Sequence, residues 1–210
     1  MKTIELFSGT KSFSKVMADH GHETYTIDND FKLNPHHVID LLLPYSWSEF
    51  ENKVDILWAS PPCQGFSVAA IGHNWSGGIR GYVPKSDSAR LSIALAKRTL
   101  EIVEEIKPQW WFIENPRGLM RKMPFMEGLI RHTVTYCQYG DTRMKPTDIW
   151  TNATWWKPRP MCKNGDRCHE AAPRGSKTGT QGIDGAKDRG RIPSALFEEI
   201  LEQMPPPKRG

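Results

Sequence analysis

An apolar run of strand length that stops at two prolines most constrains how this chain can fold. Residues 55–67 read DILWASPPCQGFS, and Pro61 and Pro62 cannot continue a hydrogen-bonded ladder. The next residue, Cys63, is therefore expected at the carboxyl end of a strand, where open α/β sheets place ligands and chemistry. A thiol held there can act as a nucleophile, although an isolated cysteine is more often a buried structural residue.

Size and composition favour a single domain. A chain of 210 residues, 38% of them hydrophobic, can bury one good core but has no room for two full domains. No apolar run approaches the length of a membrane span, and residues 1–7 have the pattern of a strand rather than of a secretory signal. We therefore expect a soluble, cytoplasmic protein without a membrane partner, whose four cysteines are reduced thiols.

The amino-terminal residues follow the order strand, turn, helix, strand. A short apolar strand at residues 3–7 precedes a turn that contains Gly9, and the helix that follows has apolar residues at helical spacing. A second strand at residues 24–27 ends at Asp28. A Gly turn followed about 20 residues later by an acid is typical of nucleoside-cofactor sites, but a simple turn explains Gly9 equally well.

A polar stretch follows the Cys63 loop. Residues 68–87 contain several glycines and no apolar period, so we expect a loop that closes over a substrate, ahead of a helix at residues 90–106. Four side chains in the loop are candidates to touch a nucleic acid, although scattered polar loop residues most often face water. They are His73, Asn74, Trp75 and Arg80.

The residues around Cys63 resemble the catalytic loop of the DNA cytosine-5 methyltransferases, in which Pro-Cys-Gln precedes a run of the Gly/Phe/Ser type. Glu114 follows an apolar strand, as the first member of the family's Glu-Asn pair does. Arg143, with Lys145 close by, stands in place of the arginine-rich segment that braces the flipped base. The resemblance thus implies that Cys63, Glu114 and Arg143 are the catalytic residues.

The same resemblance implies a site for S-adenosyl-L-methionine. The family has a Phe-x-Gly turn after the first strand, an acid after the second, and an acid after the third that reads the adenine amino group. With the proline of the Cys63 loop, the corresponding residues are Phe7, Ser8, Gly9, Asp28, Asn29, Asp40, Leu41 and Pro61. Lys11 departs from the pattern, because the family usually has a further glycine there. Taken alone, Asp40 could equally be a helix N-cap.

The fold implied is a Rossmann-like α/β methyltransferase domain, with a mostly parallel sheet and helices on both faces. Residues 1–152 would form the catalytic core, and residues 191–210 the helix that completes it. The activity implied is transfer of a methyl group from S-adenosyl-L-methionine to carbon 5 of cytosine in DNA, by covalent addition of Cys63 to a flipped-out base. Two alternatives stay open: a nucleic-acid-binding module with weak or no activity, and a methyltransferase that acts on RNA or a free nucleotide.

Residues 153–190 stand where the family inserts a target-recognition domain. Between residues 141 and 191 there are eleven Lys and Arg against six Asp and Glu, which suits a polyanion such as double-stranded DNA, although a solvated basic loop is nearly as good an explanation. So short and Gly-rich a segment cannot fold independently. We expect a minimal recognition region, and a partner protein could supply specificity. A methyltransferase this compact would suit a bacteriophage or a mobile element.

Three cysteines and a histidine predict a structural zinc site. Cys162, Cys168 and His169 lie in a stretch with too few apolar side chains to hold itself together, and Cys137 could supply the fourth ligand. Tetrahedral zinc accepts a Cys₃His set. The spacing from Cys162 to Cys168 is wider than usual, however, and neighbouring Cys168 and His169 do not easily face one ion. Free thiols and a surface histidine are therefore the alternative.

Overall fold

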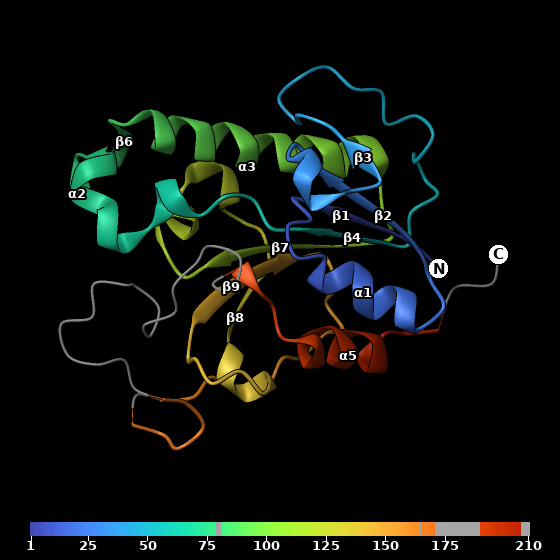
Figure 1. The fold of residues 1–210 in the computed structure, drawn as a ribbon. Helices are drawn as coiled ribbons and strands as arrows, with labels where there is room; N and C mark the ends of the chain where they lie inside the picture. The colour runs from blue at the N-terminus through green and yellow to red at the C-terminus, as the bar shows by residue number, and fades with distance from the viewer. Residues whose placement is uncertain (79–80, 164, 171–189, 207–210) are drawn as a thin grey trace.

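A seven-stranded, mostly parallel sheet lies at the centre of the protein (Figure 1). The computed structural model describes residues 1–78, 81–163, 165–170 and 190–206. The strand order is β3-β2-β1-β4-β7-β9-β8, in which β9 alone runs antiparallel to its neighbours. The strands are β1 Lys2–Leu6, β2 Glu23–Asp28, β3 His37–Val38, β4 Ile56–Ala59, β7 Trp110–Pro116, β8 Arg131–Thr135 and β9 Pro146–Thr151.

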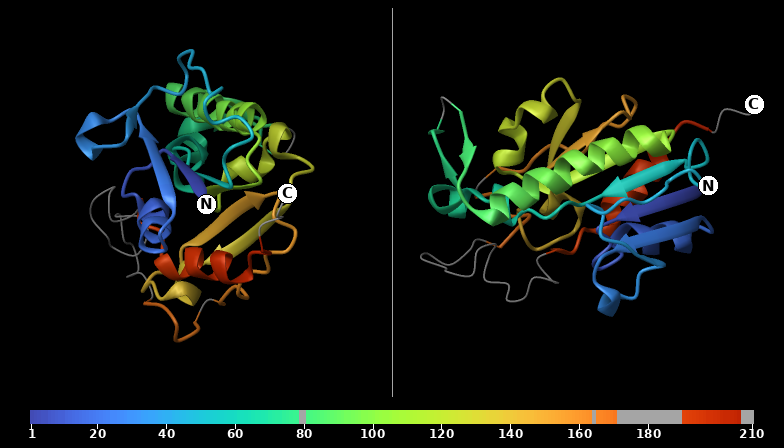
Figure 2. Two further views of the ribbon diagram at one scale, coloured as in Figure 1. Left: turned by 90° about the vertical axis from the view of Figure 1, so that its right-hand side faces the viewer. Right: turned by 90° about the horizontal axis from the view of Figure 1, so that it is seen from above.

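Helices cover both faces of this sheet, as the sequence predicts. The helix α3 (Asp87–Ile106) packs on one face, and α1 (Ser12–Asp19) and α5 (Ser194–Gln203) pack side by side on the other (Figures 1 and 2). This is the Rossmann-like α/β architecture expected of a methyltransferase domain. It brings the carboxyl ends of β1, β2, β4 and β7 to one edge of the sheet.

The central strand β4 explains why its sequence is apolar without interruption. Ile56 and Trp58 face the helices α1 and α5, whereas Leu57 and Ala59 belong to the core under α3. A strand buried on both faces needs apolar residues at successive positions rather than at alternate ones. Trp58 is fully buried and stacks between Phe13 and Phe112. Burial of such a side chain contributes about 1.5–3 kcal/mol.

The long helix α3 begins three residues earlier than the apolar spacing predicts. Ser86 caps it, because its Oγ accepts a hydrogen bond from the Ala89 amide at 3.1 Å. A serine N-cap satisfies one of the amide groups that the first helical turn leaves unpaired. At the other end Lys107 adopts a left-handed conformation with φ 52°, and Pro108 follows.

The expected loop at residues 68–87 instead contains the short helix α2 (Ile71–Asn74) and a hairpin of β5 (Trp75–Ser76) and β6 (Val83–Pro84). Asn74 and Trp75 are buried, so the expectation that they touch a nucleic acid is wrong. They point inward because they hydrogen-bond to the backbone of the Cys63 loop. His73 is exposed, and Arg80 lies outside the described residues.

Half of the expected recognition segment, residues 171–189, also lies outside the described residues, as do residues 207–210. The helix α5 lies within the expected carboxyl-terminal region and packs against α1. Among the helices in the described ranges, none is long and apolar enough to cross a membrane.

Candidate active site

Cys63 lies where β4 ends, as the two prolines predict. It is partly exposed and precedes a 3₁₀ turn, Gln64–Phe66, in which the Phe66 amide donates to the Cys63 carbonyl at 3.0 Å. Two buried side chains support the turn from behind. Asn74 Nδ2 donates to the Gln64 carbonyl at 3.1 Å, and Trp75 Nε1 donates to the Gly65 carbonyl at 2.6 Å. Asn74 and Trp75, two of the four residues expected to touch a nucleic acid, therefore hold the Cys63 loop in place.

Gly65 brings this loop into contact with α3. Its amide donates to Ser92 Oγ at 3.2 Å. A Cβ added at Gly65 would lie 2.5 Å from that oxygen and 2.6 Å from the Ser88 carbonyl, so a side chain cannot fit without a shift. The approach of the two backbones thus requires glycine at this position.

Glu114 occupies the corresponding end of β7, the strand beside β4. It is buried, and its Oε1 accepts a hydrogen bond from the Tyr136 hydroxyl at 2.8 Å. Burial raises the pKa of Tyr136 well above its ordinary value, and the neighbouring Glu114 carboxylate raises it further. Tyr136 therefore stays protonated and donates, while Glu114 accepts.

Asn115 joins the two strand ends. It is fully buried, and its Nδ2 donates to the Pro61 carbonyl at 2.9 Å. This hydrogen bond ties the residue next to Glu114 to the loop that carries Cys63. The two catalytic candidates are thus held on neighbouring strands by a direct contact between their own segments.

Arg143 lies in the connection between the 3₁₀ turn Tyr136–Tyr139 and β9, which begins only at Pro146. The basic segment at Arg143 and Lys145 is therefore a loop. Arg143 is buried and forms an ion pair with Asp141, with Nε 2.8 Å from Oδ1. Burial opposes ionisation of Asp141, but the hydrogen bonds and charge of Arg143 outweigh it and hold the pKa of Asp141 below its ordinary value.

Lys145, which the resemblance places with Arg143 in the basic segment, is a further residue of the site. It is buried, and its Nζ lies over the Tyr136 ring, 4.7 Å from the centroid. Burial lowers the pKa of Lys145, while the charges of Glu114 and Cys63 act in the opposite direction. Its ammonium group therefore lies in the electrostatic field of both catalytic candidates. The available signal was its place two residues after Arg143 in the same basic segment.

The turn after β1 and the acid after β2 meet as predicted. The Gly9 amide donates to Asp28 Oδ2 at 3.0 Å, and the Ser8 amide donates to the Ile27 carbonyl at 3.1 Å. Phe7, just before the turn, has φ 56°. Ser8 Oγ is buried and has no hydrogen-bond partner in the part of the chain that is described. This edge of the sheet thus combines a carboxylate with an unused polar group.

The acid after β3 lies beside this turn. The Ile39 amide donates to the Asp28 carbonyl at 2.9 Å, which brings the two segments together. Asp40 is exposed and accepts from the Leu42 amide at 3.0 Å, so it stabilises a turn rather than capping a helix. Leu41 is buried, and Asn29 is exposed. Carboxylates, an apolar side chain and an unpaired hydroxyl are a set that fits the ribose, adenine and amino groups of S-adenosyl-L-methionine.

Lys11 stands where the family pattern has a glycine, and it keeps a backbone conformation that glycine favours. It adopts the left-handed region with φ 56° and ψ 39°, at the N-cap of α1. That conformation costs a residue with a side chain about 1–2 kcal/mol. The Lys11 side chain extends to the Asn34 carbonyl, so it bridges the turn after β1 and the segment after β2.

The four predicted metal ligands also come together. The ligand atoms of Cys137, Cys162, Cys168 and His169 all lie within 4.8 Å of one another. One of the four, Cys137, lies in the turn that also carries Tyr136, the hydrogen-bond partner of Glu114.

Comparison with known proteins gives one family. Residues 1–125 match the family described as C-5 cytosine-specific DNA methylase. Over 221 residues the chain is 28% identical to a protein of Frog virus 3 (isolate Goorha) described as "Probable DNA (cytosine-5)-methyltransferase". That alignment covers 96% of this chain and 99% of the viral protein.

Two solved structures share the fold. S. pombe Dnmt2 methyltransferase is 15% identical with a TM-score of 0.50, and the alignment covers 72% of this chain and 50% of that one. Entamoeba histolytica methyltransferase EhMeth is 16% identical with a TM-score of 0.53, at 76% and 55% coverage. The chain therefore spans about half the length of these structures, and at such identities the likeness concerns the fold alone.

Proposed function

The chain belongs to the C-5 cytosine-specific DNA methylase family, and on this premise we propose that it methylates carbon 5 of cytosine in DNA through a covalent bond to Cys63. S-adenosyl-L-methionine is the methyl donor in this proposal. The observation that carries it is the arrangement at the edge of the sheet. Cys63 follows β4 and Glu114 lies near the carboxyl end of the neighbouring strand β7, their segments are joined by the hydrogen bond from Asn115 to Pro61, and Lys145 lies in the field of both.

The chemistry accounts for the cysteine. Carbon 5 of cytosine is a weak nucleophile, so the Cys63 thiolate adds to carbon 6 and forms a carbon–sulfur bond. Electron density then moves toward carbon 5 and the ring nitrogen. Glu114, carrying a proton, donates to N3 and accepts a hydrogen bond from the exocyclic amine, and so stabilises the negative charge that develops on the ring. After methylation, loss of the carbon-5 proton to a base and departure of Cys63 restore the aromatic ring.

The neighbours of these two residues prepare them for the reaction. The hydrogen bond from Tyr136 fixes the orientation of Glu114. The positive charge of Lys145 favours the thiolate form of Cys63, because an adjacent cation lowers the free energy of an anion. Arg143, paired with Asp141, braces the loop that carries Lys145.

The cofactor site is assigned to the residues around the turn after β1. When bound, S-adenosyl-L-methionine supplies an electrophilic methyl group on a sulfonium sulfur. Asp28 would hold the ribose hydroxyls, Asp40 the adenine amino group, and Ser8 a polar group of the methionine part. Phe7, Gly9, Asn29, Leu41 and Pro61 complete the proposed pocket.

The substrate base must leave the duplex to reach Cys63, because carbon 5 and carbon 6 are not accessible in a stacked helix. Phosphate contacts from the basic residues between 141 and 191 would hold the DNA. A partner protein that adds sequence specificity stays a prediction.

Release of tritium from carbon 5 tests the proposal. Cytosine labelled at carbon 5 is supplied in DNA, in RNA and as free dCTP, with S-adenosyl-L-methionine present. We expect release from DNA, and none from the Cys63→Ser variant. Release from RNA or dCTP alone would move the assignment to those substrates. No release from any of them, with a protein that binds the cofactor in calorimetry, would contradict methyl transfer.

A further inference from the structure

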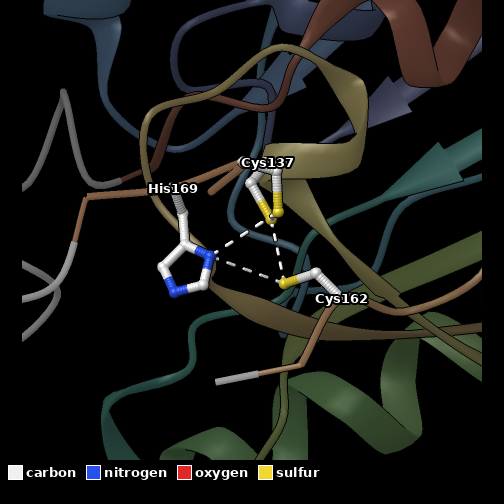
Figure 3. Close-up of side chains that lie close together, drawn as sticks. Cys137, Cys162 and His169 are labelled. Atoms are coloured by element: carbon white, nitrogen blue, oxygen red, sulfur yellow. Dashed lines mark hydrogen bonds between the residues drawn. The ribbon is translucent and has the colours of Figure 1, made fainter. Parts of the chain in front are cut away.

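Four possible metal ligands from separate parts of the chain meet at the turn that carries Tyr136. Cys137 lies in the turn after β8, and Cys162, Cys168 and His169 come from the segment that follows β9. Figure 3 shows the side chains of Cys137, Cys162 and His169 pointing toward one another. Cys137 and Cys162 are buried, His169 is half-buried and Cys168 is exposed.

Three of the six distances between these ligand atoms match those expected around one ion, and all six are within 4.8 Å. Cys168 Sγ lies 3.6 Å from Cys137 Sγ, and His169 Nδ1 lies 3.7 Å from Cys162 Sγ and 3.6 Å from Cys168 Sγ. Tetrahedral zinc, with bonds of about 2.3 Å to sulfur and about 2.0 Å to nitrogen, holds its ligand atoms about 3.5–3.8 Å apart. Cys168 and His169 are neighbours in the chain and were not expected to face one ion easily. Their ligand atoms nevertheless point to the same place.

A disulfide is the competing explanation for part of the cluster. Cys137 Sγ and Cys162 Sγ are 3.1 Å apart, which is longer than the disulfide length of about 2.05 Å. The same distance is shorter than that of a zinc-bound pair, so either bond requires a small shift. A disulfide would use two of the four groups and would leave the convergence of Cys168 and His169 unexplained. A metal ion uses all four.

The described residues of the surrounding segment lie mostly at the surface. Among the described residues from 161 to 170, Cys162 is the buried one. Two backbone contacts fix its ends: the Cys162 amide donates to Thr135 Oγ1 at 3.0 Å, and the Glu170 amide donates to the Thr142 carbonyl at 2.9 Å. Small regions without an apolar core commonly use a metal ion in its place.

We propose that Cys137, Cys162, Cys168 and His169 bind one structural zinc ion. Four protein ligands close the coordination sphere, so the ion is structural rather than catalytic. It cross-links residues 162–170 to the turn in which Cys137 directly follows Tyr136, the partner of Glu114. The ion therefore positions the turn that carries Tyr136 and takes no part in methyl transfer. This proposal is independent of the one for the reaction.

Metal analysis of the protein tests it directly. The full chain is purified without a His-tag under reducing conditions, and its metal content is measured by mass spectrometry. We expect about one equivalent of zinc. Replacement by Co²⁺ should produce the visible absorption of a tetrahedral thiolate complex. Removal by a chelator should speed amide exchange in residues 136–143 and 161–170 but leave β1 and β4 protected.

Cys168→Ser is the informative variant, because Cys168 is exposed and its replacement disturbs the least packing. After dialysis against a chelator it should keep less than about a tenth of an equivalent of zinc, since one ligand is lost. Cys63→Ser is the matched control. It changes the cysteine outside the cluster and should keep the whole equivalent.

Three outcomes would overturn the site. One is wild-type protein with less than about a tenth of an equivalent of any metal and four native thiols open to titration. Another is a Cys137–Cys162 disulfide found by peptide mapping. The third is a Cys168→Ser variant that retains zinc as tightly as the wild type. If that variant does not fold, the metal content and amide exchange of the wild type still decide the question.

Discussion

The Tyr136 hydroxyl donates a 2.8 Å hydrogen bond to Glu114, and the Lys145 ammonium lies over the same tyrosine ring. One buried aromatic side chain thus contacts both the carboxylate proposed to bind cytosine and the cation beside Cys63. Tyr136 comes from the turn after β8, whereas Glu114 lies near the carboxyl end of β7. The chemistry proposed at Cys63 therefore depends on a segment that does not carry a reacting atom.

Tyr136→Phe should slow the reaction while the fold stays intact. The variant keeps the ring under Lys145 and removes the hydrogen bond to Glu114. A hydrogen bond to a charged group contributes about 1.5–3 kcal/mol, so kcat should fall by roughly one to two orders of magnitude. Single-turnover methylation measures this effect.

Tyr139→Phe is the matched control for that experiment. Tyr139 also donates to a buried carboxylate, at 2.9 Å, but its partner Glu199 belongs to the helix α5. It should lower the midpoint of unfolding and leave kcat nearly unchanged. Equal losses of kcat in the two variants would show that Tyr136 acts only through stability.

Cys63→Ser should abolish turnover and preserve binding of S-adenosyl-L-methionine. A neutral hydroxyl at this position is not a nucleophile for carbon 6. With the wild type, DNA that contains 5-fluorocytosine should give a covalent adduct visible on a denaturing gel, because fluorine cannot leave as a proton does. Methyl transfer by the serine variant at a rate near that of the wild type would contradict the covalent mechanism.

Asp28→Ala should weaken cofactor binding by about 1.5–3 kcal/mol, the range for hydrogen bonds to a charged group. The change removes the proposed ribose contact and the acceptor of the Gly9 amide. Calorimetric titration with S-adenosyl-L-methionine measures it. Asp30→Ala, two residues on at an exposed position, is the control and should bind normally. An unchanged affinity for Asp28→Ala would leave the residue a strand-end role only.

The stability of the protein should fall as pH rises from about 4.5 to about 7, because of Glu5. Burial raises its pKa from 4.5 to about 7, although the carboxylate accepts hydrogen bonds from the Phe13 and Ser14 amides. The folded state therefore binds more protons than the unfolded state between these values. The resulting loss of stability develops from about pH 4.5 upward, is complete above about pH 7, and is on the order of 3 kcal/mol.

Denaturant unfolding at about pH 5 and about pH 8 measures this dependence. Glu5→Gln should remove most of the difference between the two conditions. Glu127→Gln, at an exposed position, should leave it as in the wild type. A Glu5→Gln protein with an unchanged pH profile would assign the dependence to other groups.

Sequence selectivity should be low. Each good bidentate contact with a base contributes about 1–3 kcal/mol of discrimination, but it needs a rigid element in a groove. The short Gly-rich segment at residues 153–190 favours phosphate contacts instead. Bisulfite sequencing of methylated random DNA should show dependence on about one or two neighbouring bases. A strict longer site would indicate a partner protein or a dimer that reads the DNA.

The sequence predicts those features that depend on a few consecutive residues. The end of β4 at Pro61 follows from a chemical property of proline, which cannot donate to the ladder. The pairing of the Gly9 turn with Asp28 follows from the parallel sheet, in which neighbouring strands end at the same edge. The zinc ligands could be named from their residue types, but only the structure brings them together.

The features that the sequence does not predict depend on contacts between distant segments. Trp75 and Asn74 lie in a polar, Gly-rich stretch with no apolar period, yet the Cys63 loop covers them. Lys145 lies in a basic segment of the sequence, whereas the fold buries it against Tyr136. Burial of this kind results from packing, and local periodicity carries no information about it.

The close approach of Gly65 to α3 limits how the Cys63 loop could be exchanged with the loop of a relative. Since the Gly65 amide and the Ser88 and Ser92 positions meet with no space for a further carbon, the loop and the first turns of the helix form one unit. A chimera that exchanges only residues 61–67 with a relative would combine a loop and a helix that were not matched to each other. Exchanging the loop together with residues 86–92 should preserve the position of the thiol.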